Sequence, residues 1–390
     1  MTLRWRAVAL ASAAALPLAV LGAGTGAGTG DDASVGTSAG DRAGDNPAVW
    51  RLSLRSERHN DALPLSVPGD DTWRRLLPRS GRNLAYQDDE VRLSRSAGQA
   101  PGQWIWALLA RNHATLVASQ QALALAARVA NSRRPAADAQ WQAGVRLRAF
   151  AGAGIAIGRT QPLAPGWSAH WEAQTLALSR WRARDLGGAV QYGAASRQYS
   201  FDLQSQEIDN RLATPFRQDF AARGVGLLLA GGLDWAGSST WARVALRDGG
   251  WLRWRGVPQQ RASLNTATEA VDADGFLLYK PLVTGRNSQS GAQRWLPWRS
   301  QVAAGLALAD GQRWGLQIDA LPGFGALPAL LWQRPAPAPD GLALGAEWQV
   351  HERRLTLSSA WQGLSLRIGA DRLGSAARSR VLVLGYGRAF

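Results

Sequence analysis

The most constraining feature of this chain is a series of short segments in which apolar and polar residues alternate with a period of two. One of them reads WQAGVRLRAF, where Val145, Leu147 and Ala149 fall on one face and Arg146 and Arg148 on the other. Successive side chains of a β-strand point to opposite faces, so this pattern predicts strands with one apolar and one polar face.

The same alternation recurs in residues 50–55, 167–184, 199–204, 342–351, 355–361 and 364–371. Strands of about ten residues with alternating polarity and short turns are typical of a transmembrane β-barrel, although a soluble β-sandwich also alternates. We therefore predict an all-β fold, an antiparallel barrel of roughly 12–16 strands. Near Leu176 and Leu178 the two faces blur, which indicates a bulge or a partly apolar lumen.

Two details favour the membrane over the sandwich. The polar faces carry Arg, Glu, Gln and Gly, which suits a water-filled interior, while Leu, Val, Ala and Trp suit lipid outside. Many of the 19 tryptophans are expected at strand ends, as in the aromatic girdles of membrane proteins; core tryptophan is the alternative. The tryptophans in question are Trp235, Trp241, Trp251, Trp254, Trp295, Trp298, Trp314 and Trp332.

The N-terminus has the pattern of an export signal. Arg4 and Arg6 precede an apolar run at 7–21, and small residues follow at 22–24, so we predict a cleaved signal peptide over 1–22. An uncleaved anchor is the alternative, but the run is short for a membrane-spanning helix. Residues 23–45 are rich in Gly, Ala, Ser, Thr and Asp, which predicts a flexible linker.

The chain ends in the apolar, alternating sequence VLVLGYGRAF. This segment resembles the terminal strand of Gram-negative outer-membrane β-barrel proteins, which typically end in Phe. The resemblance covers only about the last ten residues and is to the class, with no specific family recognised. It implies an assembly signal formed by Gly385, Tyr386 and Phe390 and read by the barrel-assembly machinery. Arg388 departs from the pattern, because a hydrophobic residue is usual there.

We divide the mature chain into two parts. Residues 46–135 are less regular, with a few strands, a Pro-rich loop and an Ala- and Leu-rich stretch that predicts either a strand or a helix, the helix acting as a plug or lying at the periplasmic mouth. Residues 136–390 form the barrel. Within them, 256–297 is long and polar, which predicts an extracellular or inward-folded loop.

Composition excludes several kinds of chemistry. The chain has no cysteine, so disulfides and thiolate sites are absent. Its net charge is +15, but the arginines that supply this charge are spread singly along the chain, which argues against nucleic-acid binding. The four histidines lack metal-ligand spacing, and no GxSxG motif is present. Ser168 and His170 share a strand face that points to the lumen, which indicates a polar pair more than a catalytic one. We expect no cofactor, no metal and no enzyme activity.

The functional prediction depends on arginines whose strand phase points them inward. They are Arg146, Arg148, Arg180, Arg182, Arg184, Arg243, Arg247 and Arg367. Rings of arginine attract anions in pores, so these residues are candidate anion-binding groups. The alternatives are a salt-bridged structural lumen, with Glu172, Asp202, Asp234 and Glu347 as partners, and strand-end arginines that bind lipopolysaccharide phosphates at the rim.

Three functions remain open. The first is a porin-like channel or export pore of the cell outer membrane for anionic solutes or polysaccharide. The second is a non-conducting barrel that anchors a secretion or envelope-assembly complex through a periplasmic partner. The third is a lipid-modifying enzyme. In each case the expected surroundings are outer-membrane lipid and lipopolysaccharide, reached by export.

Overall fold

The computed structural model describes residues 48–66, 76–97, 102–212, 223–267, 269–271, 277–279, 281–337 and 341–389. The predicted signal peptide (1–22), the predicted linker (23–45) and Phe390 lie outside the described residues. Among the described residues, no helix has the length and apolarity that crossing a bilayer would demand.

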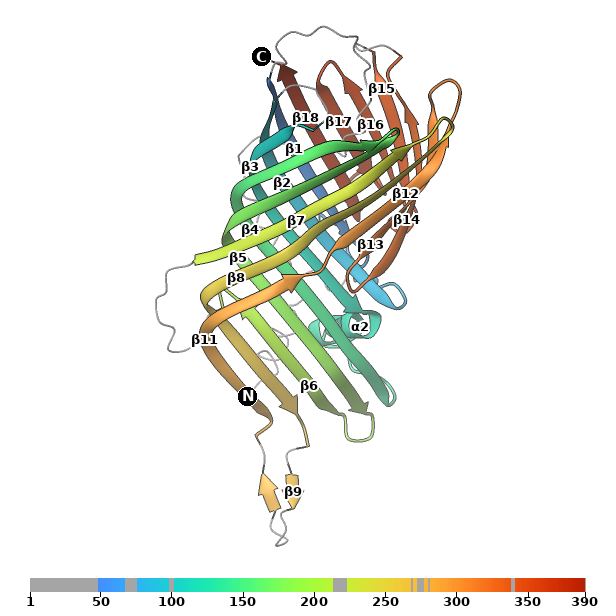
Figure 1. Ribbon diagram of the computed structural model, residues 1–390. Coiled ribbons are helices and arrows are strands. Elements are labelled where there is room, and N and C mark those ends of the chain that lie inside the picture. The colour runs from blue at the N-terminus through green and yellow to red at the C-terminus, as the bar shows by residue number, and fades with distance from the viewer. Residues whose placement is uncertain are drawn as a thin grey trace.

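Strands make up most of the described chain (Figure 1). The main sheet contains β1 (Ala48–Asn60), β2 (Arg82–Ala97), β3 (Trp104–Ser119), β4 (Ala139–Ala164), β5 (Trp167–Gly193), β6 (Gln198–Asp209), β7 (Arg223–Ala236), β8 (Thr240–Asn265), β11 (Val283–Leu296), β12 (Arg299–Ala307), β13 (Arg313–Leu321), β14 (Gly325–Arg334), β15 (Ala343–Gln349), β16 (Arg354–Trp361), β17 (Leu364–Ala370) and β18 (Ser379–Ala389). A separate small hairpin joins β9 (Glu269–Val271) to β10 (Leu277–Tyr279), and helix α2 spans Gln120–Ala130.

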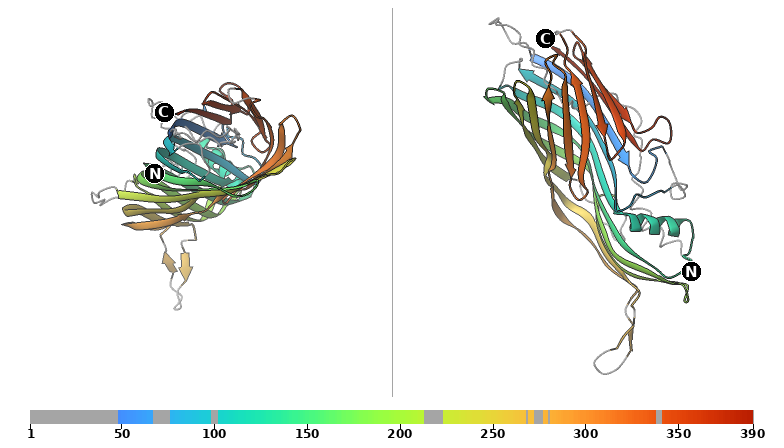
Figure 2. Two further views of the ribbon diagram at one scale, coloured as in Figure 1. Left: turned by 45° about the horizontal axis from the view of Figure 1, so that its top comes forward. Right: turned by 90° about the vertical axis from the view of Figure 1, so that its right-hand side faces the viewer.

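These strands close into an antiparallel barrel, because β1 pairs with β18 as well as with β2. Strands β6 and β7 together occupy one position between β5 and β8. Strands β11 and β12 likewise share the other edge of β8. The sixteen described strands of the sheet therefore fill fourteen positions around the ring (Figure 2, left). The predicted fold class, an antiparallel barrel of 12–16 strands, is confirmed.

The N-terminal region is part of this wall. We predicted that 46–135 would be less regular, with a few strands, a loop and a plug or a periplasmic helix; in the structure β1, β2 and β3 are full barrel strands. Their alternation is weakened at Asp88, Asp89 and Glu90, where charged residues occupy both faces. The strand phase had therefore been harder to see there than in the C-terminal half.

Strands β4, β5 and β8 are 26 or 27 residues long, whereas β13–β18 have only 7–11 residues. One side of the barrel therefore continues beyond the other as a curved extension, built from β4, β5, β6, β8 and β11 (Figures 1 and 2). This extension contains most of 256–297, which was predicted to be a loop. Polar residues on both faces had hidden these strands, since the extension lies beyond the apolar belt.

The two ends of the barrel differ. Turns of two or three residues connect β4 to β5, β7 to β8 and β16 to β17 at one end, where the C-terminus lies (Figure 1). The longer connections, including α2 and the β9–β10 hairpin, lie at the other end. In outer-membrane barrels the short turns are periplasmic and the long loops extracellular, which assigns the extension to the outside.

An apolar band covers the outward face of the barrel. Leu52, Leu108, Val244, Leu316 and Leu357 are exposed members of it, and they come from strands all around the ring. Water would solvate this surface poorly, whereas lipid chains match it. The structure thus has the outward-facing apolar belt of a membrane-spanning, outer-membrane type of barrel.

Tryptophans border this band on the outside. Trp167 packs near Trp235 and Trp314 near Trp332 at the short-turn end, with ring centres 6.2 and 6.4 Å apart. Trp251 and Trp295 contact each other edge to face on the opposite border. These positions agree with interfacial girdles.

Two predicted girdle residues instead point inward. Trp254 is fully buried and lies over Gly224, and a Cβ atom at Gly224 would come within 2.1 Å of its ring. Trp241 covers Gly315 on the inner face of the neighbouring strands. Only glycine leaves room for an indole to lie flat on the sheet, so the predicted girdle position of these two tryptophans is wrong.

The bulge predicted near Leu178 is present. The β4–β5 register shifts between Ala151 and Gly152, where Ser179 is the extra residue on β5. Leu176, Leu178 and Trp181 consequently all face inward and join an apolar cluster with Leu228, Leu252 and Trp254. The lumen is therefore partly filled with packed apolar side chains at this wall.

Helix α2 covers the outer face of the extension. Its N-cap Ser119 accepts a hydrogen bond from the Ala122 amide at 3.1 Å, and its buried face packs on Trp141 and Leu147 of β4. These apolar side chains share the outward face with the membrane belt. The helix removes them from water where the strands pass beyond that belt.

Trp254→Ala tests the inner core. It removes a fully buried indole, so we expect the free energy of unfolding to fall by about 3–5 kcal/mol. Trp251→Ala is the matched control. This side chain is exposed on the outward face, so its removal should lower the free energy of unfolding by less. Urea unfolding of protein folded in lipid vesicles measures both. Equal losses would contradict the inward assignment of Trp254.

Candidate functional site: the barrel interior

The interior holds a polar cavity of about 860 Å³. Its lining includes ten arginines and nine carboxylates from strands all around the barrel, so the wall is close to charge-balanced. Small residues such as Ser53, Ser94 and Gly158 line part of the same space. The cavity is thus polar enough to hold water and a charged solute.

One group of side chains, the Arg111 cluster, crosses this interior. It consists of Asp88, Glu90, Arg111, His113, Asp248 and Arg299. Arg111 of β3 donates to Asp248 of β8 at 2.7 Å, and its Nε lies 3.0 Å from Glu90. Arg299 of β12 reaches His113 on β3, with Nη2 3.1 Å from Nε2. Five strand positions separate β12 from β2 by the shorter path, so these contacts join opposite walls.

A second group, the Arg354 cluster, consists of Glu57, Tyr86, Glu347, Glu352 and Arg354. Arg354 of β16 donates to Glu57 of β1 at 2.9 Å and lies 2.7 Å from Glu352. Tyr86 of β2 donates to Glu352 at 2.7 Å. Strands β17, β18 and β1 lie between β16 and β2, so this cluster joins non-adjacent strands on one side of the ring.

Three of the candidate anion-binding arginines, Arg243, Arg247 and Arg367, line the cavity. Arg243 pairs with Asp234 and Arg367 with Glu347, which are two of the four acids named as structural partners. Arg247 donates to Gln301 at 3.1 Å.

Arg146 and Arg148 also lie on the inward face, but on the extension, outside the cavity lining. Arg148 donates to Asp185 at 2.7 Å, and Arg294 reaches the same carboxylate at 3.0 Å. Arg146 and Asp185 line a separate groove on the extension.

Arg180, Arg182 and Arg184 face outward, so their predicted lumen position is wrong. The extra residue at Ser179 reverses the strand phase after the bulge. On the outer face they form a charged row with β6, with Arg180–Asp209 at 2.8 Å and Arg182–Glu207 at 3.0 Å. A shift of one residue therefore moved three candidates to the other face.

The central arginines of both clusters, and Arg92 beside them, were missed. Arg92, Arg111 and Arg299 lie on strands whose sequence alternates poorly, and Arg354 immediately precedes the alternating run 355–361. Arg92 of β2, for example, binds Glu172 of β5. One available signal was that Asp88 and Glu90, two apart on one strand, demand cations on the facing wall; Asp89 between them points outward to Ser56.

The polar pair at Ser168 and His170 lines the same cavity, as predicted. His170 Nδ1 lies 3.5 Å from Asp234, which is already bound by Arg243. The pair faces the interior rather than lipid, so its position gives no support to a lipid-modifying reaction.

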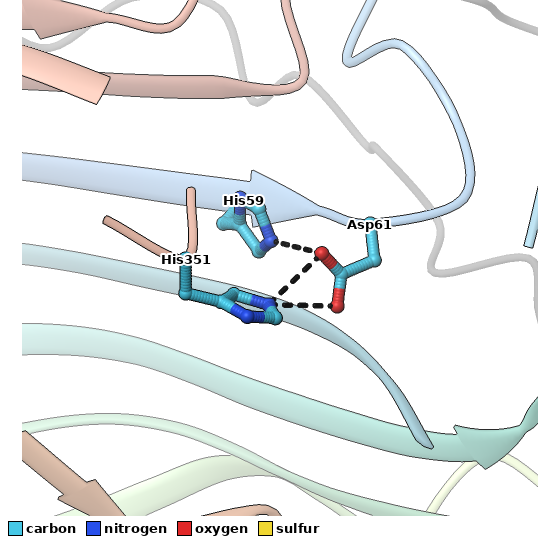
Figure 3. A group of neighbouring side chains, drawn as sticks. All are labelled: His59, Asp61 and His351. Atoms are coloured by element: carbon cyan, nitrogen blue, oxygen red, sulfur yellow. Dashed lines mark hydrogen bonds and ion pairs between the residues drawn. The ribbon is translucent and has the colours of Figure 1, made fainter. Parts of the chain in front are cut away.

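A further polar cluster lies at the long-loop end. His59 lies one residue before the end of β1, Asp61 directly follows the strand, and His351 comes from the turn between β15 and β16 (Figure 3). Asp61 accepts from the Leu84 amide at 2.8 Å. Burial alone would raise the pKa of Asp61, but hydrogen bonds with His351 and His59 outweigh it and hold that pKa well below its usual range.

No family model and no curated protein matches this chain. Among solved structures, the chain is similar to a TodX deltaS2S3 mutant monoaromatic hydrocarbon channel, with a TM-score of 0.41, 9% identity and coverage of 89% of this chain and 91% of that one. It is also similar to the ferric enterobactin receptor PfeA from Pseudomonas aeruginosa, with a TM-score of 0.20, 9% identity and coverage of 89% and 82%.

Arg111→Met tests the Arg111 cluster. It leaves Asp88, Glu90 and Asp248 with too few cations in a buried place, so we expect unfolding free energy to fall by about 3–5 kcal/mol. Arg134→Met, in an exposed loop, removes the same charge and should change the free energy of unfolding little. Urea unfolding in vesicles measures both, and a near-neutral Arg111→Met would contradict a stabilising role for the cluster.

Proposed function

We propose that this protein is a channel of the cell outer membrane that passes small anionic solutes, and that its interior ion pairs hold the passage narrow in the present conformation. The observation that carries the proposal is the polar cavity of about 860 Å³ inside the barrel, lined by ten arginines. A closed barrel with an apolar outside and a charged inside suits passage of polar solutes across lipid.

Guanidinium groups supply the preference for anions. A solute carboxylate or phosphate offers the same pair of acceptor oxygens as the acids that now bind these groups. Such a solute can exchange with Asp234 at Arg243 or with Glu347 at Arg367. Because nine carboxylates line the same cavity, the preference is expected to be moderate. An extended anionic polysaccharide is a larger alternative substrate, because it carries the same kind of anionic groups.

Cross-lumen ion pairs explain the narrowness. Arg299 extends from β12 to partners on β2 and β3, so its side chain lies across the passage. Its side chain remains partly exposed, which suits a group that exchanges partners. Passage of a solute then requires these ion pairs to break, and the separated charged groups bind the solute or water instead.

The membrane setting is also part of the proposal. We infer export by a cleaved signal peptide at 1–22 and recognition of Gly385, Tyr386 and Phe390 by the barrel-assembly machinery. Tyr386 is exposed on the outward face of β18, in register with Leu52 and Leu364. Arg253 and Arg255 follow Trp251 on the outward face of β8, where lipopolysaccharide phosphates would be suitable partners.

The cross-lumen contacts also favour a second candidate, a non-conducting barrel that anchors a secretion or envelope-assembly complex. The Arg111 cluster ties opposite walls together, and the Arg354 cluster ties non-adjacent strands on one side of the ring. A rigid anchor would use such contacts, whereas an open pore would not. A periplasmic partner would then bind at the short-turn end. Conductance separates the two candidates.

Arg299→Ser tests the channel in planar bilayers. Removing this side chain takes away a group that lies across the lumen, so we expect a larger unit conductance than in the wild type. Arg134→Ser, in the exposed loop, carries the same charge change and should conduct as the wild type does. In a salt gradient the reversal potential of the wild type should show preference for anions.

Two results would overturn the proposal. If folded, heat-modifiable wild type and Arg299→Ser both fail to conduct, the anchor becomes the better account. If both conduct with preference for cations, the channel stands and the anionic substrate class is wrong.

A further inference from the structure

Three side chains from distant parts of the chain converge at the long-loop end of the barrel. His59 and Asp61 are fully buried, and His351 is about one-fifth exposed. The ligand atoms of the three lie within 4.8 Å of one another. Alternation along β1 puts residues 59 and 61 on the same inward face, and the β15–β16 turn brings His351 to them (Figure 3).

The atoms that meet there are of the kind that bind transition metals. His59 Nε2 lies 3.0 Å from Asp61 Oδ1, and His351 Nε2 lies 3.1 Å from both carboxylate oxygens. Zinc binds imidazole nitrogen and carboxylate oxygen at about 2.0–2.2 Å, so ligand atoms around it stand only slightly farther apart than these. We propose that His59, Asp61 and His351 form a divalent transition-metal site of the zinc class.

The surroundings of His59 fit this assignment. Its second ring nitrogen, Nδ1, is buried, has no hydrogen-bond partner in the described structure, and lies 3.7 Å from Glu352. Metal-bound histidines generally direct the other nitrogen toward a carboxylate, which fixes the tautomer and ring orientation. A small approach of Glu352 completes this arrangement and leaves Nε2 free for the metal.

A guanidinium group occupies the space beside His351 and Asp61. Arg79 Nη1 donates to the His351 carbonyl oxygen at 2.8 Å, and it lies 2.8 Å from Asp61 and 3.2 Å from His351 Nε2. A divalent cation would compete with this guanidinium for the Asp61 carboxylate. A cation between His351 and Asp61 uses the lone pair on Nε2 and the carboxylate together.

Arg79 therefore acts as the competing cation. Its side chain is about one-third exposed, so it can withdraw into solvent when a metal enters. Ligands of two imidazoles and one carboxylate favour Zn²⁺ over Ca²⁺ or Mg²⁺, which take mainly oxygen. The bound ion would tie the end of β1 to the β15–β16 turn and so strengthen the outer end of the barrel.

The test uses tag-free, full-length protein folded in detergent and stripped with chelator. Titration with ZnCl₂ by calorimetry should show about one ion per chain. His351→Gln should weaken binding by more than about tenfold, since even outer-shell changes cost that much. Arg79→Ser should tighten binding, because it removes the competing cation, an effect that a merely structural role would not produce.

His170→Gln is the matched control, as His170 lies elsewhere in the lumen beside Asp234. It should bind Zn²⁺ as the wild type does. Zn²⁺ should raise the unfolding midpoint of the wild type but not of His351→Gln. No binding by folded wild type, or equal affinity in His351→Gln, would overturn the proposal; an effect of Zn²⁺ lost equally in His170→Gln would also do so.

Discussion

The requirement that dominates this molecule is that a backbone crossing lipid must satisfy all its hydrogen bonds internally. Pairing of β1 with β18 meets it, because the ring then has no free edge within the membrane. Closure of the ring also decides which side chains face lipid and which face the interior. Side chains that alternate along each strand are divided between lipid and interior, and the belt that includes Leu108 and Leu357 faces outward.

The interior places many charged side chains in a small, partly dry space, where unpaired charges would destabilise the fold. Arg111 and Arg354 each serve several carboxylates at once, which offsets the cost of removing those charges from water. Because the partners come from non-adjacent strands and their side chains meet in the interior, the same contacts both hold the barrel together and narrow its passage. Structural support and control of passage therefore depend on the same side chains.

The asymmetry of the barrel separates its parts by environment. Strands β4, β5 and β8 continue past the apolar belt, and α2 covers the apolar outer face there. The bulge at Ser179 falls where this extension begins and reverses which side chains face outward. The His59–Asp61–His351 cluster lies at the same end, where the short strands finish and loops from distant segments meet.

Local sequence was sufficient for the fold class, because a period of two over about ten residues is a property of each strand alone. The same period indicated an inward phase for Arg243, Arg247 and Arg367, which line the cavity in the structure. Tertiary structure decided the rest. A single extra residue at Ser179 moved Arg180, Arg182 and Arg184 outside, Trp254 turned inward where Gly224 left room, and strands far apart in the chain brought Arg299 to Asp88 and His351 to Asp61. Phase and contact depend on register with neighbouring strands, and register is fixed by the packing of the whole ring.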